Sequence, residues 1–379
     1  MKITKLEILR PGWFILIKLH TDEGIVGIGD CHPGSACVGS AQAVIGALKF
    51  CEEQLIGQDP LTIEAHWQNI FRRTLFRGGS DPMSALGAVD MALWDIAGKA
   101  YGLPVYKLLG GLTRSRIRLY VQIGGKTPEE VAESAQRAVA QGFTGVKLVP
   151  LDRSFERKGY WSNVRVAVRY VEAVRKAVGD DIDIGIDVIC RLKPFEAIAI
   201  GRALEPYGLY YFEDPIEPDN IDAMAYVAAN VPVPIATGER LYTIFQFREL
   251  LNKNAAQFVR PDASLVGGIS NCKKIAALAE ASYVGVMLHN PLTPVLTAVN
   301  VQLSAAIHNC VVLEYMGIES QGALRDLVKE PVPFDNGYLI VPDKPGLGVE
   351  LDEEGIRKHP QVPGSRSALI SSDGSLRDY

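Results

Sequence analysis

The chain has 379 residues, of which 47% are hydrophobic, and its formal net charge at pH 7 is −5. A chain of this length and composition can bury a large core, so we expect a soluble globular protein with more than one domain. The acidic balance and the lack of a basic run argue against nucleic acid as a partner. No run of about 18 apolar residues predicts a membrane span. Charged side chains within residues 1–9 argue against a signal peptide, and we expect a cytoplasmic location.

The first elements along the chain predict an α+β domain over residues 1–115. Residues 13–19 and 25–28 have the composition of strands, and the polar turn between them predicts an antiparallel hairpin. Two helices are expected next, over residues 41–55 and 84–101. In the second helix apolar side chains recur at three- and four-residue spacing, which is typical of an amphipathic helix.

From residue 117 short apolar strands alternate with amphipathic helices. The predicted strands cover residues 118–123, 145–149, 183–188, 209–212, 234–237, 258–260, 284–288 and 311–313. The helices expected between them include residues 128–141 and 163–178. Parallel strands joined by right-handed crossovers fit this alternation, so we expect a barrel domain over residues 116–320.

Polar side chains stand at the ends of most of these strands. They are Lys147, Asp187, Glu213, Glu239, Asp262, His289 and Glu314. From Asp187 onward their separations are 26, 26, 23, 27 and 25 residues, each close to one strand plus one helix. Because the carboxyl ends of barrel strands meet at one mouth, we expect these side chains to share a site. Acids, a lysine and a histidine in one place indicate a metal-assisted enzyme.

Three of the acids, Asp187, Glu213 and Glu239, end consecutive strands and are expected to be neighbours. Acids this close repel one another unless their pKa values rise or a cation lies among them. A set of ligands made only of carboxylates suits a hard ion such as Mg²⁺. A single acid could instead form an ion pair with Arg191 or Arg240. Three acids at the same position of consecutive strand-and-helix units favour a bound metal cation.

Short motifs recur in order along both predicted domains. They are Arg77-Gly-Gly, Ala92-Leu-Trp-Asp-Ile-Ala-Gly-Lys, Leu109-Gly-Gly, Gly145-Val-Lys-Leu, Ile186-Asp-Val, Phe212-Glu-Asp-Pro, Thr237-Gly-Glu-Arg, Arg260-Pro-Asp, Leu288-His-Asn and Leu313-Glu. Together these motifs resemble those of the enolase superfamily, in its mandelate racemase/muconate lactonizing enzyme family. Within that family the chain is most similar to the galactonate dehydratase-like acid-sugar dehydratases. The resemblance implies an α/β fold: a (β/α)8-type, modified TIM barrel with an α+β capping domain. The cap would combine the N-terminal part with residues 321–379, which return to it and end in a tail.

The resemblance also implies roles for the strand-end residues. Asp187, Glu213 and Glu239 match three Mg²⁺ ligands, and the ion would stabilise the enediolate that forms when the proton α to a carboxylate is removed. Glu314 matches an acid that is hydrogen-bonded to the substrate carboxylate, for which it would have to be protonated. 

A His/Asp dyad is implied as well, with His289 as the base and Asp262 orienting its ring. Lys147 matches a positive charge near the substrate carboxylate. The chain departs from the family at Val149, where a second lysine base is common, and at Ile189, where galactonate dehydratases carry a histidine acid. These departures leave most of the proton transfer to His289.

The leading functional hypothesis is therefore syn-dehydration of an aldonate or aldarate to a 2-keto-3-deoxy acid. Two alternatives stay open: a racemase, epimerase or cycloisomerase that uses Lys147 and His289, and a barrel that binds an acidic ligand without converting it.

The expected partner is a small-molecule carboxylate, and the resemblance implies a homo-oligomer between a dimer and an octamer. Residues 30–40 and the loop over residues 151–161 are expected to define the pocket, because a cap closes over the barrel in this architecture. Candidate substrate contacts are His32, Arg153, Tyr160, Trp161 and Arg191.

Overall fold

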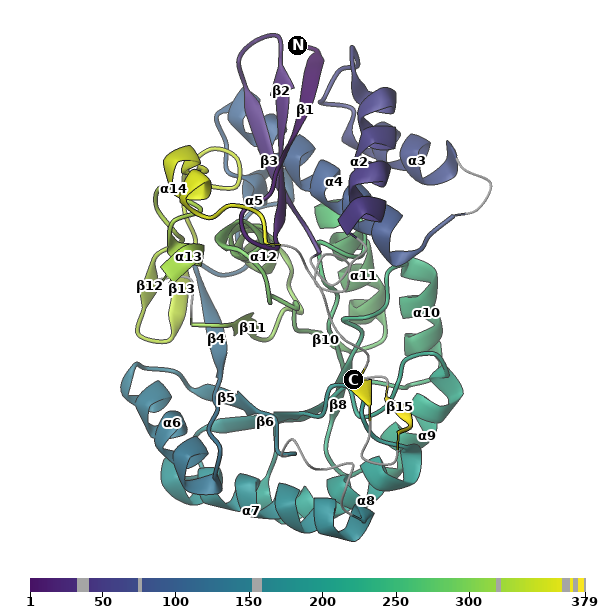
Figure 1. Ribbon diagram of the computed structural model, residues 1–379, viewed down its shortest axis with the longest axis vertical. Helices are drawn as coiled ribbons and strands as arrows, with labels where there is room; N and C mark the ends of the chain where they lie inside the picture. Colours follow the sequence, from purple (N-terminus) through teal and green to yellow (C-terminus); the bar gives the residue numbers. More distant parts are fainter. Residues whose placement is uncertain are drawn as a thin grey trace.

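A computed structural model describes residues 1–32, 41–73, 77–151, 159–317, 322–362, 369–370 and 374–377. Figure 1 shows an N-terminal sheet with its helices at one end of the molecule and a ring of strands surrounded by helices at the other. None of the helices in the described ranges is long and apolar enough to cross a membrane.

The N-terminal sheet has three antiparallel strands, β1 (Ile3–Leu9), β2 (Ile15–Thr21) and β3 (Val26–Cys31). Its helices are α2 (Ala41–Leu55), α3 (Ile63–Arg73) and α4 (Ser80–Tyr101). Strand β3 packs so closely on α4 that a Cβ added to Gly27 or Gly29 would lie 2.0 Å from a backbone oxygen of that helix. The predicted hairpin is β2–β3, and helix α2 has the predicted bounds.

Eight parallel strands form the ring. They are β4 (Arg116–Gln122), β5 (Gly145–Leu148), β6 (Asp183–Asp187), β7 (Tyr211–Glu213), β8 (Ile235–Thr237), β9 (Phe258–Val259), β10 (Gly285–Val286) and β11 (Leu313–Tyr315). Neighbours in sequence are neighbours in the sheet from β4 to β10, and β11 pairs with β4. A bridge between Val286 and Cys310 joins β10 to the segment that leads into β11, so the sheet closes on itself.

Helices follow the first seven strands of the ring and cover its outside (Figure 1). They are α6 (Pro128–Ala140), α7 (Tyr160–Val178), α8 (Pro194–Leu204), α9 (Ile221–Asn230), α10 (Ile244–Asn252), α11 (Gly268–Ala281) and α12 (Pro294–Ala306). Several begin at polar caps: the Thr127 side chain accepts from Glu130 N, and Thr293 accepts from Val295 N. The (β/α) alternation expected from the sequence is present throughout.

The C-terminal segment contacts both parts. Strand β13 (Tyr338–Ile340) pairs antiparallel with β4 and, through a hairpin, with β12 (Phe334–Asp335). Further on, Leu347 N–H donates to Asp95 of α4 at 2.8 Å, and His359 O accepts from Gly12 N–H at 2.9 Å. The remaining short elements are α5 (Val105–Leu108), η2 (Glu205–Tyr207), α13 (Gly322–Arg325), α14 (Glu353–Lys358), β14 (Leu369–Ile370) and β15 (Leu376–Arg377). The domain boundaries at residues 115 and 320 stay predictions.

Candidate active site

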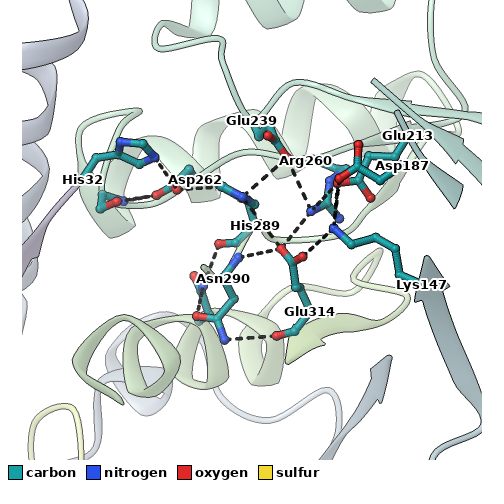
Figure 2. A network of polar contacts seen from close by, with 12 residues as sticks. His32, Lys147, Asp187, Glu213, Glu239, Arg260, Asp262, His289, Asn290 and Glu314 are labelled. Carbon is teal, nitrogen blue, oxygen red and sulfur yellow. Dashed lines mark hydrogen bonds and ion pairs between the residues drawn. The ribbon is translucent and has the colours of Figure 1, made fainter. Parts of the chain in front are cut away.

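The seven predicted strand-end residues meet at the mouth of the ring formed by the carboxyl ends of the strands (Figure 2). Four carboxylates form what we call the acid cluster: Asp187, Glu213, Glu239 and Glu314. Each comes from a different strand of the ring or from the residues directly after that strand. Because the strand ends meet at the mouth, the first and last of these acids share one site although they are 127 positions apart in the chain. The predicted convergence is therefore present in the described part of the chain.

Lys147 is a cation inside the acid cluster. Its Nζ lies 2.7 Å from Glu314 Oε1, 3.0 Å from Glu213 Oε1 and 3.5 Å from Asp187 Oδ2. Burial opposes the charged form of the lysine, but the fields of Glu213 and Glu314 outweigh it and raise its pKa well above the usual value. Lys147 is therefore a fixed positive charge.

Arg260 is a second cation in the cluster, and sequence reasoning assigned it no role. Its side chain is completely buried, and Nη2 lies 2.9 Å from Glu314 Oε2, 3.1 Å from Glu213 Oε1 and 3.8 Å from Glu239 Oε2. Nη1 donates to the Tyr120 hydroxyl. Its position in the sequence could have indicated a place at the mouth, because Arg260 directly follows strand β9 and precedes Asp262 by two residues.

In this arrangement the neighbouring cations favour an ionised Glu314; the protonated form, expected where Glu314 hydrogen-bonds a substrate carboxylate, stays a prediction. Burial favours the neutral acid, but Lys147 and Arg260 overcome it and hold the pKa of Glu314 well below its usual range. The Asn290 backbone N–H also donates to Glu314 Oε2, at 3.1 Å. Both carboxylate oxygens are thus occupied as acceptors by groups of the chain itself.

Two other acids of the cluster are less well neutralised. Burial, with like charges nearby, raises the pKa of Glu213 well above its usual value even though both cations are close. One reason is that Glu213 Oε2 is buried and has no hydrogen-bond partner among the described residues. Burial likewise raises the pKa of Asp187, whose Oδ1 accepts from the Ile189 N–H at 2.7 Å. 

Ile189 itself has a positive φ of 56°. That backbone conformation is uncommon for a β-branched residue, so the turn after β6 is locally strained.

His289 and Asp262 form the predicted pair. Nδ1 of the ring lies 2.8 Å from Asp262 Oδ2, and Nε2 points to the acid cluster, 3.4 Å from Glu239 Oε2 and 3.9 Å from Glu314 Oε2. Burial works against the charged ring, but Glu239 and the hydrogen bond to Asp262 raise the pKa of His289 to about 9. An ionised Asp262 as acceptor places the Nδ1 proton toward it, which leaves Nε2 as the nitrogen that exchanges protons.

The predicted substrate contacts are more dispersed. His32 reaches the mouth from the end of β3, where its Nε2 lies 3.6 Å from Asp262 Oδ2. Tyr160 and Trp161 begin α7 with their rings 5.0 Å apart, and Trp161 is 57% exposed; the described residues show neither of them bonded to the mouth residues. Arg191 follows β6, and Arg153 lies outside the described residues. The substrate roles of these side chains stay predictions.

Comparisons with known proteins agree with this fold and site. The family model for the mandelate racemase/muconate lactonizing enzyme N-terminal domain matches residues 9–110, and the model for enolase C-terminal domain-like proteins matches residues 130–355. The D-galactonate dehydratases of Variovorax paradoxus and Pectobacterium atrosepticum are each 40% identical to the chain over the full length of both proteins. 

Solved structures are similar as well. The crystal structure of an enolase from Agrobacterium radiobacter, proposed to be a galactarate dehydratase and bound to Na and L-malate, has a TM-score of 0.92 and 34% identity, covering 99% of each chain. A cap and a barrel with this site define a protein of the enolase superfamily. The chain belongs to the mandelate racemase/muconate lactonizing enzyme family, which confirms the resemblance and the fold class predicted from its motifs.

Proposed function

We propose that this protein is a Mg²⁺-dependent acid-sugar dehydratase, a hydro-lyase that removes the proton α to a carboxylate and eliminates the β-hydroxyl. The product would be a 2-keto-3-deoxy acid. The observation that carries the proposal is the His289–Asp262 pair facing a cluster of strand-end carboxylates. The similarity of the chain to D-galactonate dehydratases over its full length supports the same reaction class.

The residues at the mouth fit a divalent cation. Lys147 and Arg260 supply two positive charges against four carboxylates, so a divalent ion would let the acids with raised pKa values, Glu213 and Asp187, ionise as well. The unpartnered Oε2 of Glu213 is the kind of hard oxygen donor that Mg²⁺ takes. Asp187, Glu213 and Glu239 would hold the ion, as members of the enolase superfamily use Mg²⁺. A Mg²⁺ ion bound there would supply Lewis-acid stabilisation of charge on the substrate carboxylate.

Proton transfer would fall to His289. Its Nε2 faces the acid cluster, while its Nδ1–H is donated to Asp262, so the ring is fixed with one nitrogen toward the substrate side. Glu239, near Nε2, is the largest cause of the raised pKa, and the hydrogen bond to Asp262 adds to it; neutralising the charge of the acids near Nε2 would therefore lower the pKa of the ring and favour its basic, unprotonated form. His289 would then take the α proton and pass it to the β-hydroxyl that leaves from the same face.

The racemase alternative needs a second base, and the geometry disfavours Lys147 in that role. Its ammonium group is held by two carboxylates at 2.7 and 3.0 Å, and their fields outweigh burial to keep its pKa well above the usual value. In this arrangement the lysine is held in its protonated form, which is the wrong form for taking a proton from carbon at neutral pH.

A substrate screen tests the proposal. Purified protein with Mg²⁺ is incubated with a panel of aldonates and aldarates, and 2-keto acid formation is measured. We expect turnover of at least one acid sugar, lost on adding a chelator. Exchange of the α proton with D₂O without loss of water would favour a racemase or epimerase. A panel with neither exchange nor 2-keto product would overturn the proposal.

A further inference from the structure

Asp262 has two histidine partners that come from different parts of the chain. His289, from the barrel, places Nδ1 at 2.8 Å from Oδ2, and His32, from the end of β3, places Nε2 at 3.6 Å from the same oxygen. The two rings have their centroids 6.4 Å apart. In Figure 2, Asp262 lies between His32 and His289, and the acid cluster lies beyond His289.

The other oxygen of Asp262 is already occupied. Oδ1 accepts from both the N–H and the hydroxyl of Ser264, at 2.7 and 2.5 Å. Asp262 is completely buried, and the two histidines are the basic side chains among the described residues that lie within 4 Å of its carboxylate. A buried carboxylate needs such partners, because an uncompensated charge in the interior is costly. His32 is therefore part of the environment that keeps Asp262 ionised and oriented.

The backbone around His32 is fixed to both parts of the molecule. The His32 N–H donates to Ser84 Oγ of α4 at 2.8 Å. Two residues earlier, buried Asp30 accepts from the Thr293 hydroxyl at 2.7 Å and from its N–H at 3.3 Å. Thr293 follows His289 by four positions, so β3 is tied to the same barrel loop that carries the predicted base. His289 is thus linked to the end of β3 in two ways: through Asp262 and His32, and through the contact of Asp30 with Thr293 in the His289 loop.

We propose that His32 is a positioning residue for His289: it holds Asp262 from the cap side, so the proton-transferring base is complete only when β3 is seated on the barrel. This inference rests on the proposed function for its kinetic consequence. It assigns His32 a role that differs from a substrate contact, because Asp262 separates its ring from the acid cluster. Burial lowers the pKa of His32, which favours a neutral ring that offers a single N–H.

Substitutions at position 32 test the role. His32→Ala removes the ring, and His32→Gln keeps an N–H donor that can still reach Asp262. His20→Ala is the matched control, since His20 also pairs with a carboxylate, Glu7 at 2.9 Å, but on the outer part of the N-terminal sheet. Two readouts are needed: steady-state kinetics with unlabelled and α-deuterated acid sugar, and the ¹⁵N chemical shifts of the His289 ring in protein without substrate.

Loss of orientation should slow proton transfer rather than weaken binding. For His32→Ala we expect kcat to fall about 10-fold or more, the deuterium isotope effect to rise and KM to change by less than about 2-fold. The ¹⁵N shifts of His289 should move, and His32→Gln should restore part of both effects. A substrate contact would instead raise KM and leave the isotope effect unchanged, which would overturn the inference.

The NMR measurement separates this inference from the proposed function. If wild-type protein dehydrates no acid sugar but His32→Ala shifts the His289 ring, the function fails and the positioning role stands. Unchanged His289 shifts in His32→Ala overturn the positioning role whatever the activity. If His32→Ala does not fold, the same two readings are taken from His32→Gln and from His32→Asn, whose shorter side chain cannot reach Asp262 in the same way.

Discussion

Lys147 and Glu314 are 167 positions apart in the chain, yet Lys147 Nζ lies 2.7 Å from Glu314 Oε1 across the barrel mouth. Arg260 takes the other oxygen of Glu314 at 2.9 Å. Glu314 therefore acts as an anion that holds two cations in place. The chain itself thereby supplies two of the positive charges that balance the acid cluster.

Removing Lys147 should destabilise the protein. Lys147→Met leaves buried Glu213 and Glu314 with one cation fewer, and breaking a buried ion pair on one side costs about 3–5 kcal/mol. Urea denaturation without metal measures the loss, and added Mg²⁺ should recover part of it. Lys329→Met is the control, because its pair with Glu350 is exposed and should contribute little to stability. Equal effects of the two substitutions would contradict the role of Lys147.

Mg²⁺ should stabilise the folded chain even without substrate. An ion that binds only the native state at about 100 times its Kd adds about 2.7 kcal/mol, so the melting temperature should rise with Mg²⁺ and fall again with a chelator. Glu213→Gln should abolish most of this rise, because it removes a charged donor whose Oε2 is unpartnered. Glu330→Gln, at an exposed pair with Lys344, should respond to Mg²⁺ as the wild type does. A rise that persists in Glu213→Gln would place the ion elsewhere.

His289→Asn should abolish most of the activity while the protein stays folded. A positioned acid/base contributes roughly 10²–10⁴-fold, so kcat for 2-keto acid formation should fall by at least about 10²-fold. The exposed His308→Asn is the matched control and should keep wild-type rates. Dehydration that continues at the wild-type rate in His289→Asn would assign the base to another side chain.

Stability should also depend on pH through Asp90, which joins α4 to α11. Burial raises its pKa to about 7, although the Ser270 hydroxyl and N–H donate to it at 2.6 and 3.0 Å. The folded state thus holds a proton that the unfolded state releases near pH 4. This contribution is complete below pH 4 and is lost as the pH rises to about 7, on the order of 4 kcal/mol.

Denaturation midpoints between pH 4 and 8 measure the effect. Asp90→Asn should flatten this decline, because the amide has no proton to lose over that range. Asp219→Asn, at an exposed position, should leave the pH dependence as it is in the wild type. An unchanged slope in Asp90→Asn would show that Asp90 is ionised in the folded protein throughout.

Much of the fold could be predicted from local pattern. The apolar runs indicated all eight barrel strands to within a few residues, because a strand buried on both faces reads as a continuous apolar segment. Strand β1 and helix α3 were not predicted. Strand β1 carries Lys5 and Glu7 between its apolar residues, and α3 has Glu64 in its first turn and arginines in its last turn, so neither element stands out as an apolar run.

The sequence by itself determined the barrel and the acids at its mouth, since strand-plus-helix spacing brings strand ends together in any barrel of this kind. Its motifs, through their resemblance to a known family, indicated the class of protein. Only the tertiary structure decided which charges meet. Side chains from distant segments together produce three features of the site: the burial of Arg260, the low pKa of Glu314, and the contact between His32 and Asp262. Such pairings depend on distances and desolvation in the folded chain, and local sequence pattern carries no information about either.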